Sequence, residues 1–308
     1  MVLKPLKLRA SDLIGVISPG SPVNPEYLEE GIRRLQNLGF RVVTGRYATD
    51  TKGYLAGEDD NRLADLHEMF ENPDIKMIML ARGGYGCMRL IENLDYKLIA
   101  NNPKILTGFS DATALQFAIF EKTGMVSFSG PMVETNFGRN DLDDFAEKHF
   151  QDMVTGNTGN SFLPEPVAGR LGIICHGKAE GTLICGCLSV ILGLLDTEYC
   201  PDLDGAILVI EDVSEPPYKI DRAIYTLKIH RVFEKISGLV LGSFVDCESD
   251  NEPSVDEIIK PVAEEYGIPV MKNLSYGHIP GIMTIPFGVK ARLNTENGKF
   301  ELAEIPVN

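Results

Sequence analysis

Tryptophan is absent from this chain of 308 residues, and long apolar runs are absent as well. No stretch approaches the roughly 18 apolar residues that a membrane-spanning helix needs, so we expect no transmembrane segment. The first residues carry scattered positive charge without the sustained apolar core of a secretory signal. That absence predicts a cytoplasmic protein.

Cysteine is sparse and lacks the spacing of a metal site or a disulfide framework. The six cysteines form no C-x-x-C pair, and most lie in apolar segments, so reduced and buried thiols are expected. The sequence also lacks H-E-x-x-H, and its five histidines are scattered along the chain. We therefore expect neither a metal site nor another cofactor.

Positive charge is scarce relative to negative charge. The chain has 29 Lys and Arg against 44 Asp and Glu, which gives a formal net charge of −15. Nucleic acids and anionic membranes both attract basic surfaces, so neither is an expected partner. The acidic excess is interpreted as a solvated surface. The rest of the composition is that of an ordinary soluble globular protein.

Strand-like and helix-like segments alternate through the first half of the sequence. The expected strands are Leu13–Ile17, Phe40–Val43, Ile75–Ala81, Ile105–Phe109 and Met125–Phe128. The expected helices are Glu26–Leu38, Asn61–Phe70, Cys87–Ile99 and Asp111–Glu121. Continuous apolar strands alternating with helices indicate a doubly wound, flavodoxin-like parallel sheet covered on both faces. Ligands of such folds gather at the carboxyl ends of the strands.

A segment rich in Gly, Pro, Asn and Ser, residues 155–169, breaks this pattern and is interpreted as an interdomain connection. We therefore expect an N-terminal α/β domain over residues 1–155, a linker over 156–170 and a mixed α/β domain over 171–308. The second domain has expected helices at Cys187–Leu195, Lys219–His230 and Val255–Tyr266, and expected strands at Ala206–Ile210, Gly238–Phe244 and Pro269–Asn273. The dipeptide Asn297-Gly298 between alternating segments predicts a β-hairpin.

The stretch LTGFSDATALQF places Ser110 between a predicted strand and a predicted helix. Gly108 and Ala112 flank it as G-x-S-x-A, a mild departure from the G-x-S-x-G of a nucleophile elbow. Such a turn exposes Oγ at the carboxyl edge of the sheet and aims helix N-terminal N–H groups at an oxyanion. Serine is also a favoured helix N-cap. The motif alone leaves a capping role and a nucleophilic role open.

A second motif, RGGYG, follows the strand that ends at Ala81. Its three glycines within four positions allow the backbone to approach a ligand closely. The plain alternative is a tight turn, and a phosphate-binding loop is disfavoured because the G-x-x-x-x-G-K-[ST] spacing is missing. If this strand neighbours the strand before Ser110, the motif faces the serine and can supply half of an oxyanion hole.

A serine nucleophile requires a base and a carboxylate that orients the base. His278 is the best candidate base, because it lies in a Gly- and Pro-rich loop after a predicted strand. His176 is less easily dismissed than His67, His149 and His230, which we expect at surfaces or helix ends.

The candidate carboxylates gather in VIEDVSEPPYKIDR. Glu211 and Asp212 lie where a buried strand is expected to end, and an acid at that place is poorly positioned for solubility alone.

Five motifs, in this order and over nearly the whole chain, resemble the LD-carboxypeptidase family of serine peptidases. They are VISPGSPV, ARGGYGCMRL, GFSDATAL, VIEDVSEPPYKIDR and GHIPGIMTIPFG. The family includes muramoyl-tetrapeptide carboxypeptidases and microcin immunity peptidases. The resemblance implies a catalytic triad of Ser110, Glu211 and His278 in a cleft between two domains. It also implies oxyanion donors on the backbone of Asp111 and of the turn formed by Gly83 and Gly84.

The resemblance further implies a metal-independent, homodimeric enzyme that removes a terminal D-alanine from murein tetrapeptides during cytoplasmic recycling. Arg82 is the candidate partner of the terminal carboxylate, and Tyr85 is a second candidate substrate contact. The in-family alternative is cleavage of peptidyl-nucleotides, as in the immunity branch, whose members tend to be longer and stack a Trp on the nucleobase. The lack of Trp favours the cell-wall branch. Outside the family, the alternatives are a non-catalytic two-domain binding protein and a nucleotide binder that uses the glycine loop.

Overall fold

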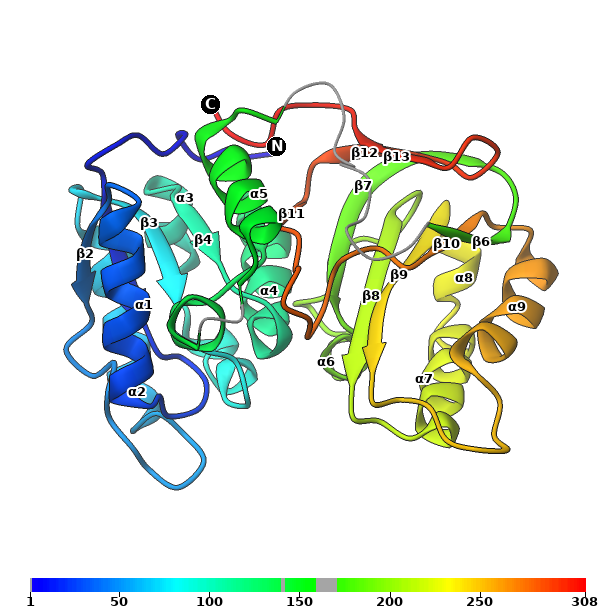
Figure 1. Ribbon diagram of the computed structural model, residues 1–308, viewed down its shortest axis with the longest axis horizontal. Helices are drawn as coiled ribbons and strands as arrows, with labels where there is room; N and C mark the ends of the chain where they lie inside the picture. The colour runs from blue at the N-terminus through cyan, green and yellow to red at the C-terminus, as the bar shows by residue number, and fades with distance from the viewer. Residues whose placement is uncertain (1, 140–141, 159–170) are drawn as a thin grey trace.

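The computed structural model describes residues 2–139, 142–158 and 171–308 of the chain, which fold around two β-sheets that lie side by side (Figure 1). One sheet has the strand order β11-β5-β4-β3-β1-β2, and the other has the order β13-β12-β7-β8-β9-β10-β6. The two-sheet α/β architecture predicted from the alternating segments is confirmed. The predicted linker lies largely outside the described residues, and the domain limits stay a prediction.

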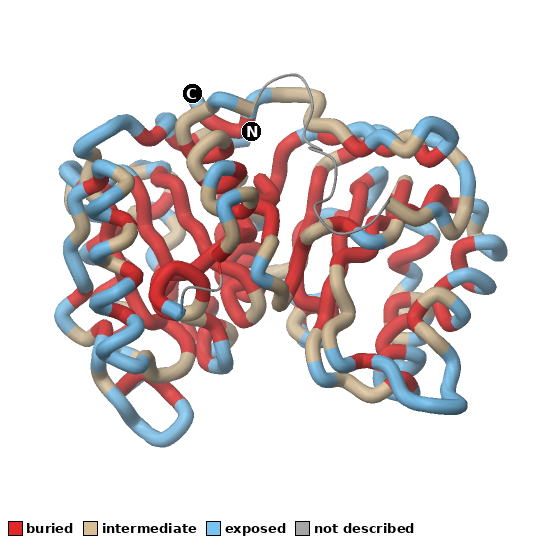
Figure 2. The backbone as a smooth tube through the Cα atoms, in the orientation of Figure 1, coloured by how far each residue is buried: buried red, intermediate tan, exposed pale blue. Residues whose placement is uncertain are grey.

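The first sheet consists of β1 (Leu13–Ile17), β2 (Arg41–Thr44), β3 (Ile75–Leu80), β4 (Ile105–Thr107), β5 (Ser127–Ser129) and β11 (Ile285–Phe287). Strands β2, β1, β3, β4 and β5 are parallel and follow the flavodoxin-like order that the alternating pattern predicts. Strands β1, β3, β4 and β5 are almost entirely buried (Figure 2), whereas the edge strand β2 is mostly exposed. Burial on both faces accounts for the nearly continuous apolar runs of β1, β3 and β4.

The helices of this half are α1 (Pro25–Asn37), α2 (Asp59–Glu71), α3 (Tyr96–Asn101), α4 (Thr113–Thr123) and α5 (Asp144–Thr155). The expectation of one helix over Cys87–Ile99 is wrong, because two 3₁₀ turns, Cys87–Arg89 and Ile91–Asn93, precede a short α3. The side chain of Asp95 accepts a hydrogen bond from Leu98 N–H and caps α3. An aspartate at that place favours a new helix start over a helix interior.

The second sheet consists of β6 (Gly172–Cys175), β7 (Lys178–Cys187), β8 (Ile207–Val213), β9 (Gly238–Val245), β10 (Val270–Lys272), β12 (Lys290–Asn294) and β13 (Lys299–Leu302). Its helices are α6 (Leu188–Leu192), α7 (Pro217–Ile229), α8 (Val232–Lys235) and α9 (Val255–Tyr266). Strands β7 to β10 are parallel, and the others pair antiparallel, so the sheet is mixed. The predicted mixed α/β character of this half is confirmed. The hairpin around Asn297-Gly298 is confirmed as β12 and β13.

Strand β11 comes from the second half of the chain but pairs antiparallel with β5 of the first sheet. The chain therefore crosses from one sheet to the other directly after the loop that carries His278. In the same region, the buried Tyr276 hydroxyl lies 2.7 Å from Ser129 Oγ on β5. The two termini also meet, since Asn308 N–H donates to Pro5 O at 2.9 Å. These contacts hold the two sheets in one arrangement.

Within the described ranges, no helix combines the length and the apolar character that crossing a bilayer requires.

Candidate active site

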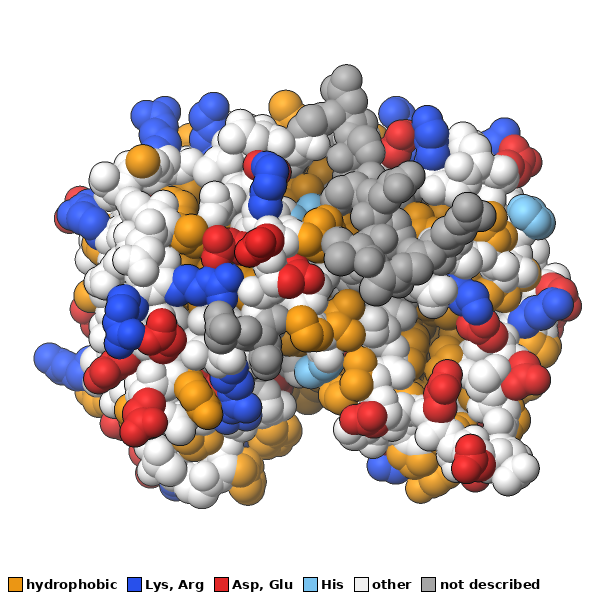
Figure 3. Space-filling model, in the orientation of Figure 1, with side chains coloured by type: hydrophobic (Ala, Val, Ile, Leu, Met, Phe, Trp, Pro, Cys, Tyr) orange, Lys and Arg blue, Asp and Glu red, His pale blue; other side chains and the backbone are white. Residues whose placement is uncertain are grey.

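The carboxyl ends of β3 and β4 in one sheet, and of β8 and β9 in the other, point to the same side of the molecule (Figure 1). The surface is hollowed there, between the two lobes (Figure 3). This is the edge at which parallel α/β sheets place their ligands. The residues that the sequence nominates for chemistry follow these strand ends.

Ser110 follows β4 and begins a 3₁₀ turn, Ser110–Ala112, that leads into α4. Its φ angle is +60°, in the left-handed region that a serine adopts only under constraint. Within the described residues its side chain caps neither the turn nor α4, so the capping role is wrong. The helical segment starts at Ser110 and becomes α-helical at Thr113, within two residues of the predicted start at Asp111. A strained serine between a strand and a helix is the geometry of a nucleophile elbow.

The turn around Ser110 leaves no space for a side chain at Gly108. A Cβ built on Gly108 would lie 3.0 Å from Ala112 Cβ and 3.0 Å from Leu80 Cδ2, closer than ordinary van der Waals contacts. The small residues at both flanking positions are therefore required by the sharp bend itself.

The RGGYG loop lies beside Ser110, because β3 and β4 are neighbours as predicted. A Cβ built on Gly83 would lie 3.4 Å from Ser110 Oγ. Gly84 has a φ of +95°, and a Cβ there would lie 2.3 Å from Ser21 Oγ. In the described part of the chain, neither Gly83 N–H nor Gly84 N–H has a hydrogen-bond partner. These two donors are available to an incoming oxygen atom.

His278 and Glu211 form a hydrogen bond, with Nδ1 of the histidine 2.8 Å from Oε2 of the glutamate. Glu211 is fully buried within β8, which continues to Val213 and not to Ile210 as expected. Gly277 has a φ of +123°, and a Cβ there would lie 2.8 Å from Glu211 Oε2. The glycine before His278 therefore lets the loop approach the carboxylate.

Burial raises the pKa of the Glu211 carboxyl, and the hydrogen bond and charge of His278 oppose that effect. Glu211 Oε1 is buried without a hydrogen-bond partner among the described residues. The carboxylate is thus committed through one oxygen to the imidazole Nδ1. A carboxylate in this position holds the histidine in the tautomer whose Nε2 accepts a proton.

His278 also reaches the serine turn. Its ring meets the ring of Phe109, the residue before Ser110, edge to face with 5.0 Å between centroids. The structure thus brings the Ser110 turn, the glycine loop and the Glu211–His278 pair together at one place, although they come from both sheets.

Arg82 and Tyr85, the two candidate substrate contacts, lie on the glycine loop with different surroundings. Arg82 Nη1 donates to Pro22 O at 3.0 Å, and its Nε lies 4.0 Å from Oε2 of the fully buried Glu134. The opposite oxygen of Glu134 accepts from Arg139 Nη2 at 2.9 Å. Tyr85 is 48% exposed and meets the Tyr54 ring edge to face. Arg82 is therefore held in place, whereas Tyr85 projects from the loop.

Two residues near the site, Ser21 and Thr113, were not predicted from the sequence. Ser21 N–H donates to Gly83 O, and Ser21 Oγ accepts from Tyr85 N–H, each at 3.1 Å. Thr113 Oγ1, at the start of α4, accepts from Cys187 N–H at 3.1 Å and thereby joins the two sheets. The motif VISPGSPV could have pointed to Ser21, whereas the contact of Thr113 depends on tertiary packing.

Four of the other nominated side chains make contacts within the fold, and the fifth is exposed. Asp212 faces away from His278 and accepts from Ser189 N–H at 2.9 Å, which holds the start of α6. His149 is buried and accepts from Thr284 N–H at 3.1 Å, so its expected surface position is wrong. His67 Nε2 accepts from Asp95 N–H, His230 pairs with Asp196, and His176 is exposed.

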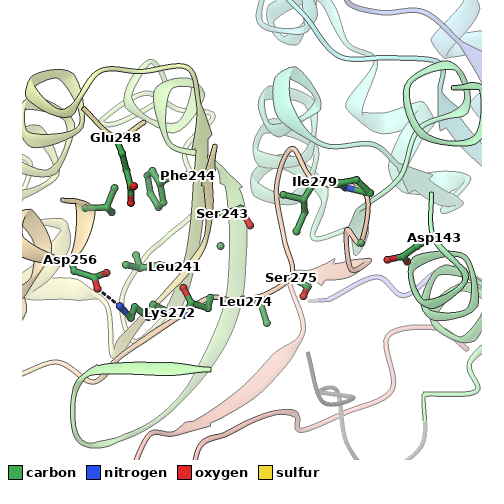
Figure 4. Close-up of a pocket in the computed structure, with 15 residues that line it drawn as sticks. Asp143, Leu241, Ser243, Phe244, Glu248, Asp256, Lys272, Leu274, Ser275 and Ile279 are labelled. Atoms are coloured by element: carbon green, nitrogen blue, oxygen red, sulfur yellow. Dashed lines mark hydrogen bonds and ion pairs between the residues drawn. The ribbon is translucent and has the colours of Figure 1, made fainter. Parts of the chain in front are cut away.

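A cavity of about 630 Å³ adjoins the loop that carries His278. Figure 4 shows its walls: Ser243 and Lys272 from the ends of β9 and β10, Asp256 from α9, and Ile279 from the loop. Lys272 and Asp256 form an ion pair there. None of the three nominated triad residues, all within the described part, lines it. The cavity is therefore a neighbour of the site and not its reaction centre.

No group of three or more His, Cys, Asp and Glu side chains is placed to hold a metal ion within residues 2–139, 142–158 and 171–308.

The chain is similar to known proteins over nearly its whole length. Residues 14–130 match the LD-carboxypeptidase N-terminal domain, and residues 180–293 match the LD-carboxypeptidase C-terminal domain. A probable murein peptide carboxypeptidase of Bacillus subtilis is 35% identical over 95% of this chain and 92% of its own length.

Two solved structures are also similar to the chain. A microcin C7 self-immunity protein in complex with aspartyl sulfamoyl adenosine has a TM-score of 0.91 and 30% identity, over 99% of this chain and 100% of its own. A muramoyltetrapeptide carboxypeptidase from Oxalobacter formigenes has a TM-score of 0.81 and 30% identity, over 94% of this chain and 97% of its own. The chain belongs to the LD-carboxypeptidase family of peptidases.

Proposed function

We propose that this protein is a serine-type LD-carboxypeptidase that removes the terminal D-alanine from murein tetrapeptides. The observation that carries the proposal is the hydrogen bond between His278 Nδ1 and the buried Glu211, beside the strained turn of Ser110. Relatives that are named for murein peptide hydrolysis support the substrate class.

The proposed reaction is acyl transfer through a covalent intermediate. His278 Nε2 takes the proton of Ser110 Oγ, which attacks the carbonyl carbon of the penultimate residue. Glu211 accepts from His278 Nδ1–H and stabilises the imidazolium. The tetrahedral intermediate collapses when His278 gives the proton to the departing amine of D-alanine. A water molecule, activated by the same histidine, then hydrolyses the ester and restores Ser110.

The developing negative charge needs donors that are already in place. Backbone N–H groups of the Gly83–Gly84 turn and of Asp111 are assigned this role. The glycine N–H groups support the assignment, because they are unpaired among the described residues and lie beside Ser110. Preorganised donors are effective because they require no rearrangement as the charge forms. No step of this mechanism calls for a metal ion.

Carboxypeptidase action also requires recognition of the terminal carboxylate. Arg82 is the proposed partner, since it is adjacent to Gly83 and keeps a side chain that is 32% exposed. A guanidinium can bind a carboxylate with two parallel hydrogen bonds. Tyr85, on the same loop and exposed, is proposed to contact the substrate at the rim.

The second candidate function is cleavage of a peptidyl-nucleotide. It is favoured by the similarity to the self-immunity protein that holds aspartyl sulfamoyl adenosine. The chain lacks Trp, so stacking of an indole on a nucleobase is not available to it. For this reason we place the murein substrate first.

Purified protein should be given a murein tetrapeptide and a peptidyl-adenylate in parallel, with Ser110→Ala as the control. Release of D-alanine from the tetrapeptide by the wild type alone is the expected result. Cleavage of the peptidyl-adenylate without any action on the tetrapeptide would contradict the first proposal and support the second candidate function.

Cytoplasmic peptidoglycan recycling and a homodimeric state stay predictions. Light scattering of the purified protein measures the mass directly, and a monomer at micromolar concentration would count against the dimer.

A further inference from the structure

The Asp111 side chain is a buried carboxylate next to the nucleophile. Only 4% of the residue is exposed. Its Oδ2 accepts a hydrogen bond from Cys87 N–H at 2.9 Å, and the backbone of Gly86 also donates to the carboxylate. Burial raises the pKa of this carboxyl, and these N–H donors oppose the rise. The acceptor therefore faces the backbone that directly follows the glycine turn.

That backbone has little intrinsic rigidity. Gly84 has a φ of +95° and Gly86 has a φ of +143°, conformations that glycine permits without favouring. The turn is fixed by contacts with its neighbours. Ser21 holds one side through Gly83 O and Tyr85 N–H. Asp111 holds the other side through Cys87 N–H.

Ser21 and Asp111 connect the glycine turn to different parts of the fold. Ser21 belongs to the loop after β1, whereas Asp111 is covalently bonded to Ser110. Gly20 is packed between the two sides, because a Cβ there would lie 3.0 Å from Asp111 Oδ2 and 2.7 Å from Gly83 O. The carboxylate, Gly20 and the glycine turn thus form a layer without free space.

A buried arginine completes this layer. Arg62 is 2% exposed, and its Nη1 donates to Pro19 O in the loop that contains Gly20. A Cβ on Gly86 would lie 2.6 Å from Arg62 Nη1, so the guanidinium lies directly behind the turn. Its positive charge acts on Asp111 and favours the ionised carboxylate. A carboxylate accepts N–H donors more strongly when it is charged.

We propose that the Asp111 carboxylate is a positioning residue that holds the Gly83–Gly84 turn at a fixed separation from the Asp111 backbone N–H. One residue then supplies one oxyanion donor through its main chain and positions the other donor through its side chain. The proposal rests on the proposed function, in which both donors bind the oxyanion. Donors must lie within hydrogen-bonding distance of the oxyanion itself, so a small displacement of the turn weakens the transition state more than the ground state.

The test compares Asp111→Asn and Asp111→Ala with the wild type in D-alanine release from a murein tetrapeptide. Removal of an oxyanion donor slows such reactions by about 100- to 1,000-fold, so a displaced donor is expected to lower kcat by about 10- to 100-fold. The KM should change less than about 3-fold, since ground-state contacts are kept. Affinity for a peptide boronic acid, which forms a tetrahedral adduct with serine, should fall in proportion to kcat.

Asp65→Asn is the matched control. Asp65 is also buried and accepts a backbone hydrogen bond, from Tyr47 N–H at 2.9 Å, but it lies on α2 and holds another loop. Its substitution should lower the melting temperature and leave kcat unchanged. A kcat loss of the same size in Asp65→Asn, or wild-type kcat and boronate affinity in Asp111→Asn, would overturn the positioning role.

Ser110→Ala in the same assay separates this inference from the proposed function. An active Ser110→Ala variant would overturn the proposed function. An inactive Ser110→Ala variant together with a fully active Asp111→Asn variant would overturn the positioning role alone. If Asp111→Ala does not fold, the isosteric Asn variant still decides the outcome.

Discussion

His278 Nδ1 lies 2.8 Å from Glu211 Oε2, and this contact joins a surface loop to the buried interior of a strand. The glutamate has no exposed surface, and burial raises the pKa of its carboxyl. A charged group at that position opposes folding, so its place in the sequence is explained by what it does for the histidine. Glu211 therefore opposes folding while it supports the histidine, and the first prediction tests both effects.

Glu211→Gln should lower kcat by about 1,000- to 10,000-fold, because the histidine loses the partner that fixes its tautomer. The same change should not lower stability at neutral pH. A carboxyl whose folded pKa is raised opposes folding as the pH rises above its unfolded pKa of about 4.3, and the penalty is complete above the folded pKa. Melting temperatures at pH 5 and pH 8 will check this.

The comparison variant is Glu180→Gln, at an exposed carboxylate paired with Arg292 far from the site. It should leave kcat unchanged. A Glu211→Gln variant whose melting temperature falls further below the wild type at pH 8 than at pH 5 would contradict the account.

Gly84→Ala should disturb the glycine turn through both backbone strain and a collision with Ser21 Oγ. Gly39→Ala introduces the strain alone, because Gly39 has a φ of +92° and no atom within 4 Å of a built Cβ. The strain alone should cost about 1–2 kcal/mol of unfolding free energy in each variant, and the collision adds to that cost in Gly84→Ala. Only Gly84→Ala should also lower kcat, which D-alanine release will measure. Equal kcat values in Gly84→Ala and Gly39→Ala would show that the geometry of the glycine turn does not affect catalysis.

Arg82→Ala should abolish the preference for a free terminal carboxylate. The measurement compares kcat/KM for a peptide acid and for the corresponding peptide amide. Loss of a charge-assisted hydrogen bond should raise KM for the acid by about 10-fold or more. Arg89→Ala, on the next turn and paired with Asp59, is the control that should keep the preference. If the acid remains preferred in Arg82→Ala, another residue reads the carboxylate.

Treatment with a chelator should leave the activity unchanged, since the proposed acyl transfer needs only Ser110, His278 and Glu211 with backbone donors. The assay is D-alanine release after dialysis against EDTA, with and without added zinc. Activity that disappears on dialysis and returns with the metal would replace the serine mechanism by a metal-assisted one.

The sequence predicted features that depend on local pattern. The central parallel strands β1, β3 and β4 were predictable because their buried apolar runs are nearly continuous. Helix α9 has the predicted bounds because Ser254 and Glu257 form a capping box at its start. Ser110, Glu211 and His278 became candidates because each was expected at or after the end of a strand. Their combination into a triad came from the resemblance to the LD-carboxypeptidase family, and the structure places Glu211 inside β8 and not at its end.

Features that depend on distant packing were not predictable in this way. Strand β11 has only three residues, and its pairing with β5 is set by the meeting of the two sheets. His149 looks like a surface residue in its charged helix, yet packing buries it against Thr284. The strained φ of Ser110 and the orientation of the Asp111 carboxylate likewise arise from the assembled turn.

The central claim is that Ser110 Oγ is the nucleophile, and covalent labelling tests it most directly. The protein should be treated with a serine-reactive phosphonate and the adduct mapped by mass spectrometry. We predict a single adduct on Ser110, none in Ser110→Ala, and labelling slowed by about 1,000-fold or more in His278→Ala. An adduct on another residue, or undiminished labelling of Ser110→Ala, would contradict the account.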